Sequence, residues 1–317
     1  MKSRKLGSDG PEISVVGFGA WEAGGGAEWG TAPPDERVVE AIRAGLDAGI
    51  SWIDTAEVYG AGHSEELVAR AVAGRRDRTL LFTKVAPDEG GSGFRPEQIR
   101  PACEGSLKRL ATDWIDVYQL HWPDPHIPVE DTWGAMTELV DDGLVRWIGV
   151  SNFDADLLRR CLAVRHVDSL QQEFSMLVQD DRDLIRSCGE LGVGVLAYAP
   201  LAYGLLTGAI TRATRFDATD FRGGADQDET WARLFAPGSI DHGLAVVEAL
   251  RPIARRLGVT VAQLALAWCV HQPGVTGVIA GSRDPDHVRE NAAAGDIDLE
   301  ETDIRELDDV LVGSSIE

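Results

Sequence analysis

The sequence contains few lysines and few cysteines. Four of its 30 basic residues are lysines, at positions 2, 5, 84 and 108, so a lysine inside an apolar segment is unusual for this chain. The four cysteines, at positions 103, 161, 188 and 269, form no C-x-x-C pair. This scatter indicates neither a zinc site nor a disulfide framework. We therefore expect no bound metal and four inert thiols.

Long apolar runs are also absent from the sequence. No run approaches the roughly 18 residues that a membrane-spanning helix needs, and the first ten residues, "MKSRKLGSDG", lack the apolar stretch of a signal peptide. We expect a cytoplasmic protein without a membrane partner.

Negative charge is abundant. The formal net charge is −22, and eight acidic residues lie between Asp296 and Asp309. Such a surface repels nucleic acid and anionic membranes. The acidic run is best explained as the solvated face of a C-terminal helix. The charge leaves the oligomeric state open.

Short apolar runs alternate with longer helical patterns along all 317 residues, without a break in composition. Eight such alternations favour a single (β/α)8 barrel domain over residues 1–317. Residues 4–14 are typical of a hairpin before the first barrel strand, and residues 203–238 of a long loop after the seventh. Loops of that length usually serve a site. The predicted strands are 15–20, 51–54, 79–84, 115–122, 145–152, 168–172, 193–200 and 276–282, and the predicted helices include 35–49, 95–110, 129–143, 154–163 and 242–258.

Polar or aromatic residues stand where nearly every predicted strand ends. In a (β/α)8 barrel these carboxyl ends meet at one rim, where the chemistry of such proteins takes place. We therefore expect one site at this rim. The residues at the strand ends, in chain order, are Trp21, Asp54, Lys84, His121, Ser151, Asn152, Gln172 and Tyr198.

Lys84 ends the apolar run "TLLFTK", so its ammonium group needs a buried partner. Asp54 on the neighbouring strand is the natural one. An ammonium about 4 Å from a phenol contributes roughly 4 kcal/mol at an effective dielectric constant near 20, or about three pKa units. Lys84 would thus make Tyr59 a useful acid, with His121 orienting the substrate oxygen. Taken singly, Asp54 also suits a turn cap, Tyr59 a packing residue and His121 a hydrogen-bonded core histidine.

The sequence resembles the aldo-keto reductase family, in its bacterial, NADPH-dependent form, over nearly its whole length. The order and spacing of the matching segments agree with the predicted strands. The segments are "GFGAWEAGGGAEWG", "DTAEVYGAGHSEE", "TKVA", "SLKRLATDWIDVYQLHWPD", "GVSNF", "LAYAPLAYGLLTG", "LALAWCV" and "GSRDPDHVRENAAA".

The resemblance implies a barrel that binds NADPH without a Rossmann domain, in agreement with "GFGAWE", which lacks the third glycine of that fingerprint. It implies reduction of an aldehyde or ketone, or oxidation of the matching alcohol or sugar, by direct hydride transfer. The catalytic tetrad would be Asp54, Tyr59, Lys84 and His121, with Tyr59 as the general acid or base.

Cofactor residues follow from the same matching. Ser151, Asn152 and Gln172 would bind the nicotinamide carboxamide, and Tyr198 would stack on the ring. Arg283 would meet the 2′-phosphate, which favours NADPH over NADH. The remaining positions would be Leu201, Gly204 and Leu206 at the diphosphate, Gly281, Ser282 and His287 at the adenosine phosphate, and Glu290 and Asn291 at the adenine.

Three positions depart from the family pattern. Ala199 stands where a serine is common, which puts one hydroxyl contact to the diphosphate in doubt. Ala280 replaces a frequent proline, and His287 a frequent arginine or glutamine. Tryptophans are candidates to line the substrate pocket; we expect this role for Trp21 and Trp122, and the weaker candidates are Trp29 and Trp231.

Two alternatives remain. In the first, the chain is a cofactor-binding sensor of the potassium-channel β-subunit type with little turnover. In the second, it is a barrel hydrolase or lyase in which Lys84 forms a Schiff base. The tyrosine and histidine beside Lys84 fit reduction better than the second alternative. The substrate is not indicated by the sequence.

Overall fold

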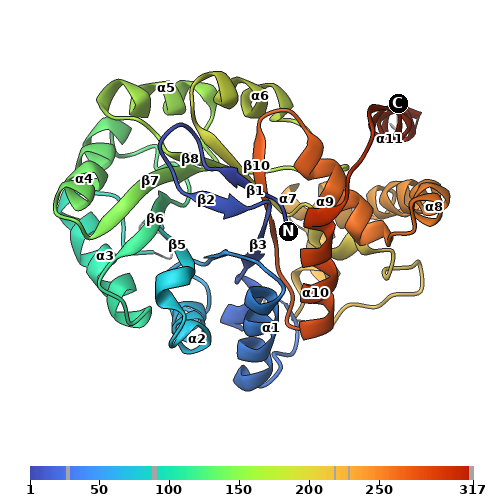
Figure 1. The fold of residues 1–317 in the computed structure, drawn as a ribbon, viewed down its shortest axis with the longest axis horizontal. Helices are drawn as coiled ribbons and strands as arrows, with labels where there is room; N and C mark the ends of the chain where they lie inside the picture. The colour runs from blue at the N-terminus through green and yellow to red at the C-terminus, as the bar shows by residue number, and fades with distance from the viewer. Residues whose placement is uncertain (26–28, 88–90, 218, 228, 314–317) are drawn as a thin grey trace.

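Eight parallel strands close a barrel in the computed structural model, which describes residues 1–25, 29–87, 91–217, 219–227 and 229–313 (Figure 1). The strands are joined in the order β10-β3-β4-β5-β6-β7-β8-β9, and helices separate them along the chain. The predicted (β/α)8 barrel is therefore confirmed. The strands are β3 (Val16–Gly19), β4 (Trp52–Asp54), β5 (Leu80–Val85), β6 (Ile115–Leu120), β7 (Val145–Ser151), β8 (Ser169–Glu173), β9 (Gly194–Tyr198) and β10 (Val275–Ala280).

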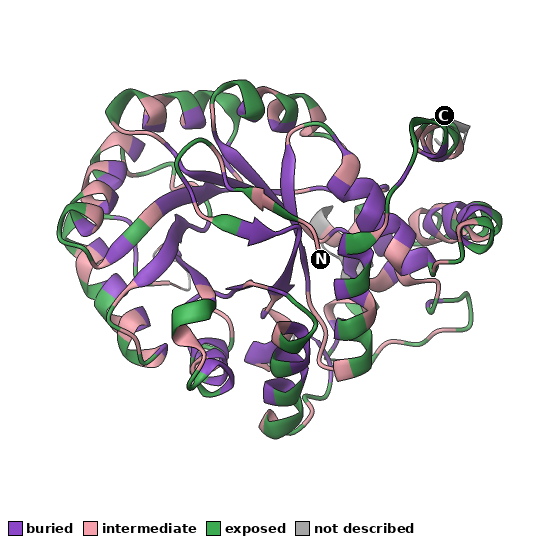
Figure 2. Ribbon diagram, in the orientation of Figure 1, coloured by how far each residue is buried: buried purple, intermediate pink, exposed green. Residues whose placement is uncertain are grey.

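Helices surround the barrel, and Figure 2 shows that the buried residues of the helices lie mainly on the side facing it. The predicted acidic helix at the C-terminus is present as α11. The helices are α1 (Asp35–Asp47), α2 (His63–Val72), α3 (Pro96–Arg109), α4 (Val129–Asp141), α5 (Ala155–Val164), α6 (Arg182–Glu190), α8 (Ser239–Leu257), α9 (Val261–His271), α10 (Pro285–Ala293) and α11 (Glu301–Gly313), with short 3₁₀ turns η1 (Glu22–Gly24), η2 (Arg76–Arg78) and η5 (Ala294–Asp296).

An N-terminal hairpin lies across the centre of the ring of strands (Figure 1). Its strands β1 (Ser3–Lys5) and β2 (Glu12–Ser14) pair antiparallel, as the sequence predicts. Leu6 and Ile13 from this hairpin are fully buried against residues inside the barrel. The hairpin thus closes the end of the barrel at which the strands begin, and leaves the carboxyl ends to form the site.

The barrel interior has an apolar layer built from one parity of strand positions. Trp52, Phe82 and Val117 are fully buried there, together with Leu196 and Ile279. Trp52 donates from Nε1 to the carbonyl of Ser14, 2.8 Å away. A Cβ at Gly17 would lie 2.2 Å from the Trp52 ring, so this position admits only glycine. Because side chains alternate along a strand, the next inward positions form a second layer above this one.

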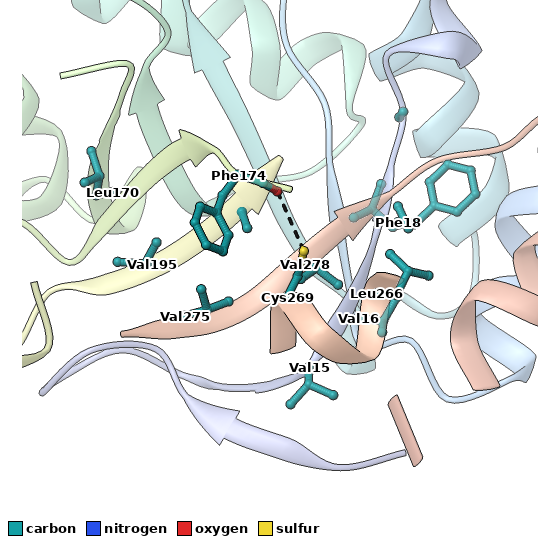
Figure 3. Packing of buried hydrophobic residues seen from close by; sticks show 14 of the residues in the cluster. Val15, Val16, Phe18, Leu170, Phe174, Val195, Leu266, Cys269, Val275 and Val278 are labelled. Atoms are coloured by element: carbon teal, nitrogen blue, oxygen red, sulfur yellow. Dashed lines mark hydrogen bonds between the residues drawn. The ribbon is translucent and has the colours of Figure 1, made fainter. Parts of the chain in front are cut away.

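Side chains of the opposite parity pack outward against the helices. Figure 3 shows Val16 and Phe18 of β3 and Val278 of β10 beside Leu266 and Cys269 of α9. The Sγ of Cys269 lies 3.8 Å from the carbonyl oxygen of Phe174. Buried apolar surface on both faces of the strands explains their nearly continuous apolar sequence.

The segment predicted as a long loop after the seventh barrel strand contains helical turns. They are η3 (Ala202–Thr207), η4 (Phe221–Gln227) and α7 (Glu229–Phe235). Leu234 and Phe235 are buried, so this segment has apolar contacts that fix its course. Trp29 in the loop after β3 forms an isolated antiparallel bridge with Asp220, which joins the two loops above the barrel.

Within the described ranges, no single helix has the length and apolar composition to cross a membrane. The pair α8 and α9 meets those two criteria jointly, with a bend of 88° between them.

We expect Trp52→Ala to destabilise the protein by about 3–5 kcal/mol, because it empties the apolar layer of the barrel. Urea unfolding followed by circular dichroism measures this loss. Trp122→Ala is the matched control, since 43% of that side chain is exposed; a loss as large as that of Trp52→Ala would contradict the assignment of Trp52 to the core.

Candidate active site

The four predicted catalytic residues lie together at the carboxyl ends of neighbouring strands. The Nζ of Lys84 donates to Oδ1 of Asp54 at 2.5 Å, to the carbonyl of Thr55 at 3.0 Å and to the hydroxyl of Tyr59 at 3.3 Å. The Tyr59 hydroxyl is also 3.4 Å from Nε2 of His121. An ammonium group has three N–H donors, and these three acceptors match them.

Lys84 is fully buried and Asp54 nearly so. Burial lowers the pKa of Lys84 below its ordinary value, and the Asp54 carboxylate opposes this by pairing with it. The ion pair holds the ammonium group where its third N–H faces the phenol oxygen of Tyr59. A donor in this position favours the phenolate form of the tyrosine.

Two glutamines that the sequence patterns do not single out complete the surroundings of Asp54. Gln171 donates from Nε2 to Oδ2 of Asp54 at 2.8 Å, and Gln119 does so at 3.3 Å. Both stand at inward positions of their strands, two residues from Glu173 and His121 respectively. For Gln119 the signal was the period of two from His121, whereas Gln171 has the opposite parity to the predicted Gln172, so that period gave no signal for it.

His121 follows directly after β6 and is buried. Burial, and secondly the charge of Lys84, lowers the pKa of this imidazole well below its usual value of 6.5. Its ring stacks on that of Trp122, with 3.6 Å between centroids. Nδ1 is buried without a hydrogen-bond partner among the described residues. A neutral imidazole at this position can orient a substrate oxygen beside Tyr59.

Four of the predicted nicotinamide residues cluster at the ends of β7, β8 and β9. Tyr198 donates to Oδ1 of Asn152 at 2.8 Å, and Asn152 donates to the carbonyl of His121 at 3.0 Å and to Oγ of Ser151 at 3.2 Å. Asn152 has a positive φ of 61°, a left-handed conformation that asparagine adopts more readily than most non-glycine residues. Gln172 lies in the same region but donates from Nε2 to Asp181.

A pocket of about 540 Å³ opens beside this cluster. Its walls include Tyr198, Asn152 and Gln172 together with the exposed Trp122. Arg233 of α7 also lines it and pairs with Glu173 at the end of β8. The pocket therefore joins the predicted nicotinamide and substrate positions.

The four tryptophans considered for the substrate pocket divide into two groups. The ring of Trp21 lies 6.3 Å from that of Tyr59, 5.0 Å from that of Trp29 and 6.2 Å from that of Trp231. Trp122 stands apart, on the His121 ring. Trp21 thus links Tyr59 to an aromatic cluster formed by the loops after β3 and β9.

The predicted diphosphate residues lie in η3 and at its start. Leu206 is buried, while Leu201 and Gly204 are half-buried. Gly204 adopts a φ of +96°, and its neighbour Tyr203 one of +53°, so the chain turns sharply here. Arg222 of η4 donates to the Tyr203 carbonyl at 3.0 Å and fixes this turn.

The predicted adenosine residues lie around the start of α10. Arg283 donates to the carbonyl oxygens of Trp29, at 3.0 Å, and Thr31, at 3.5 Å. Asn291 is buried and His287 is exposed. The remaining residues of this group, Gly281, Ser282 and Glu290, are half-buried. The structure thus brings the group to one edge of the rim, next to the loop after β3.

In the described part of the chain, no group of three or more His, Cys, Asp or Glu side chains is placed to hold a metal ion.

A family model described as "Aldo/keto reductase family" matches residues 15–312. The chain belongs to the aldo/keto reductase family. Its members are oxidoreductases, and so is this protein. "Aldo-keto reductase YhdN" of Bacillus subtilis (strain 168) is 37% identical over 294 residues, covering 90% of this chain and 86% of YhdN.

Solved structures agree with this membership. The glycerol dehydrogenase AKR11B4 from Gluconobacter oxydans superposes with a TM-score of 0.85 at 32% identity, covering 98% of this chain and 95% of that one. An aldo/keto reductase from Klebsiella pneumoniae, solved with NADP and acetate, gives a TM-score of 0.74 at 31% identity, with 97% and 96% covered.

We expect His121 to remain neutral through the range in which an unperturbed histidine titrates. Its pKa is depressed, so the stability that neutral His121 contributes is fully present above about pH 6.5 and is lost as the pH falls below that value. NMR of the imidazole resonances measures this. The same resonance in the urea-unfolded chain, titrating near pH 6.5, is the reference; equal midpoints in the two states would contradict the burial argument.

Proposed function

We propose that this protein reduces an aldehyde or ketone with NADPH, or oxidises the corresponding alcohol or sugar, with Tyr59 as the general acid or base. The observation that carries the proposal is the contact of the Lys84 ammonium with the Tyr59 hydroxyl, 3.3 Å away. A phenol at the barrel rim becomes a proton donor near neutral pH when a buried cation stabilises its anion.

The residues at the rim fit a nicotinamide cofactor. Oε1 of Gln172 is buried without a hydrogen-bond partner among the described residues, so it is available to a carboxamide N–H group. Asn152 and Tyr198 line the same pocket as Gln172. Ser151, Asn152 and Gln172 would hold the carboxamide, Tyr198 would stack on the ring, and Arg283 would face the 2′-phosphate. The NADP complex of the Klebsiella protein supports an NADP cofactor for this chain.

The chain's own residues manage the proton. Tyr59 donates its hydroxyl proton to the carbonyl oxygen of the substrate, and the phenolate that remains is stabilised by the Lys84 ammonium. His121, kept neutral by burial, orients that oxygen. Asp54 keeps Lys84 charged, and Gln171 and Gln119 keep Asp54 in place. The bound cofactor supplies the hydride that goes to the carbonyl carbon; in oxidation every transfer runs backward.

The identity of the substrate is the least constrained part of this proposal. Trp122 forms an exposed apolar wall, and Trp21 lies beside Tyr59, so both are placed to contact a substrate carbon chain. The similarity to a glycerol dehydrogenase supports the inclusion of small polyols among the candidates.

We expect Tyr59→Phe to lower kcat by about 100- to 10,000-fold and to leave the dissociation constant of NADPH unchanged, because it removes the transferred proton alone. The assay follows NADPH absorbance with a panel of aldehydes, ketones and ketoses, and NADP reduction with glycerol and other polyols. Tyr118→Phe is the matched control, since this buried hydroxyl has no partner among the described residues.

Wild-type turnover in Tyr59→Phe would overturn the assignment of the acid. Tight NADPH binding by the wild type without turnover of any compound would instead favour the sensor alternative.

Arg283→Ala is expected to weaken NADPH binding by about tenfold or more and NADH binding by less than about twofold, because the guanidinium would face the 2′-phosphate that NADH lacks. Titration of protein fluorescence with each nucleotide gives both constants. Arg289→Ala removes an exposed arginine of α10 and serves as the control. A fall in NADH affinity alone would contradict the placement of the phosphate at Arg283.

A further inference from the structure

Arg283 is already engaged by the loop after β3. Besides its bonds to the carbonyls of Trp29 and Thr31, its Nε lies 3.9 Å from Oε2 of Glu22 in η1. The exposed fractions of these two charged side chains are 23% for Arg283 and 26% for Glu22. Partial burial reduces screening by solvent, so a third charge that binds Arg283 must interact with Glu22 as well.

The other arginines around the start of α10 also have acidic partners. One of these partners, Asp284, is also the N-cap of α10, where its carboxylate accepts from the N–H of Asp286. This carboxylate therefore occupies backbone amide groups that an anion would otherwise use. Among the described residues, none of these arginines offers an uncompensated charge to a phosphate. The pairs are Arg37 with Asp284 at 2.5 Å, Arg289 with Asp286 at 2.6 Å and Arg222 with Asp220 at 2.6 Å.

Charged or titratable groups from three elements surround Glu22. They are Arg283 from the turn before α10, His287 from α10, and Arg222 and Asp220 from the segment after β9. Burial raises the pKa of Glu22 above its ordinary value, and Arg283 opposes this most strongly. Since Arg222 is bound to Asp220 through both carboxylate oxygens, Arg283 is the main counter-charge of Glu22.

We infer that Glu22 is a coenzyme-selectivity residue, which narrows the preference for NADPH over NADH by neutralising Arg283. This inference rests on the proposed binding of the 2′-phosphate near Arg283. A phosphomonoester carries a charge of about −2 at pH 7 and is repelled by a neighbouring carboxylate. The 2′-hydroxyl of NADH can instead donate to such a carboxylate, the arrangement that NAD-binding sites use, whereas an arginine accommodates the 2′-phosphate. This rim contains both kinds of group, the carboxylate of Glu22 and the guanidinium of Arg283.

The test measures the adenosine end alone. Calorimetry gives the dissociation constants of 2′,5′-ADP and 5′-AMP, two probes that differ in the 2′-phosphate. We expect Glu22→Gln to tighten 2′,5′-ADP binding by about three- to tenfold and to change 5′-AMP binding by less than about twofold. The control Glu40→Gln removes the same charge from an exposed position on α1 and is expected to change neither constant.

Glu22→Ala removes the same carboxylate in a different way, so it decides the matter if Glu22→Gln does not fold. Glu22→Asp keeps the charge and is expected to behave as the wild type. An equal effect of Glu22→Gln on both probes, an effect on neither, or a gain in Glu22→Asp as large as that in Glu22→Gln would overturn the inference. Failure of the wild type to bind NADPH would instead overturn the proposed function. This failure would be detected with the wild-type protein alone, before any variant is made, so the two outcomes are distinguishable.

Discussion

The ion pair between Lys84 and Asp54 is the constraint on which the site depends. Burying either charge alone costs several kcal/mol, and removal of one partner from a buried pair destabilises a protein by about 3–5 kcal/mol. The barrel meets this cost locally, because the ammonium group finds three acceptors and the carboxylate accepts from two glutamine amides. An apolar pair of similar volume would stabilise such a position as well or better. The charged pair is therefore best explained by its contact with Tyr59, which an apolar pair would not provide.

The two layers inside the barrel make this arrangement possible. Trp52 and Phe82 fill the lower layer, and the next inward positions of the same strands are Asp54 and Lys84. Two residues along each strand thus separate the packed core from the Asp54–Lys84 pair. The hairpin closes the lower end with Leu6 and Ile13, so the polar layer has apolar packing beneath it. Such packing limits side-chain movement and keeps the Lys84 ammonium directed at the phenol.

Sequence patterns predicted the barrel, the hairpin and the residues at the strand ends, because apolar periodicity and strand polarity are local properties. Gln119 was also predictable, since it shares the inward parity of His121, whereas Gln171 was not, since it has the opposite parity to the predicted Gln172; the amide contacts of both glutamines depend on neighbouring strands. The ion pair of Glu22 with Arg283 joins positions 261 residues apart (283 − 22) through loop geometry that no local pattern specifies. The turns η3 and η4 were missed for a related reason: they are stabilised by contacts between residues well separated in the chain, such as the bond from Arg222 in η4 to the carbonyl of Tyr203 in η3.

The net charge of −22 would repel an anionic cofactor at long range. Charges separated by more than about 8–10 Å are largely screened at physiological ionic strength, so the distant acidic helix α11 contributes little to binding at the rim. Recognition must come from groups in direct contact with the cofactor. At the proposed adenosine edge these would be arginines with acidic partners, whereas at the proposed nicotinamide edge they would be neutral amides and an aromatic ring. Under the proposed binding mode, affinity at the nicotinamide edge should therefore depend weakly on salt, and the charge-dependent part of coenzyme choice would be confined to the surroundings of Arg283.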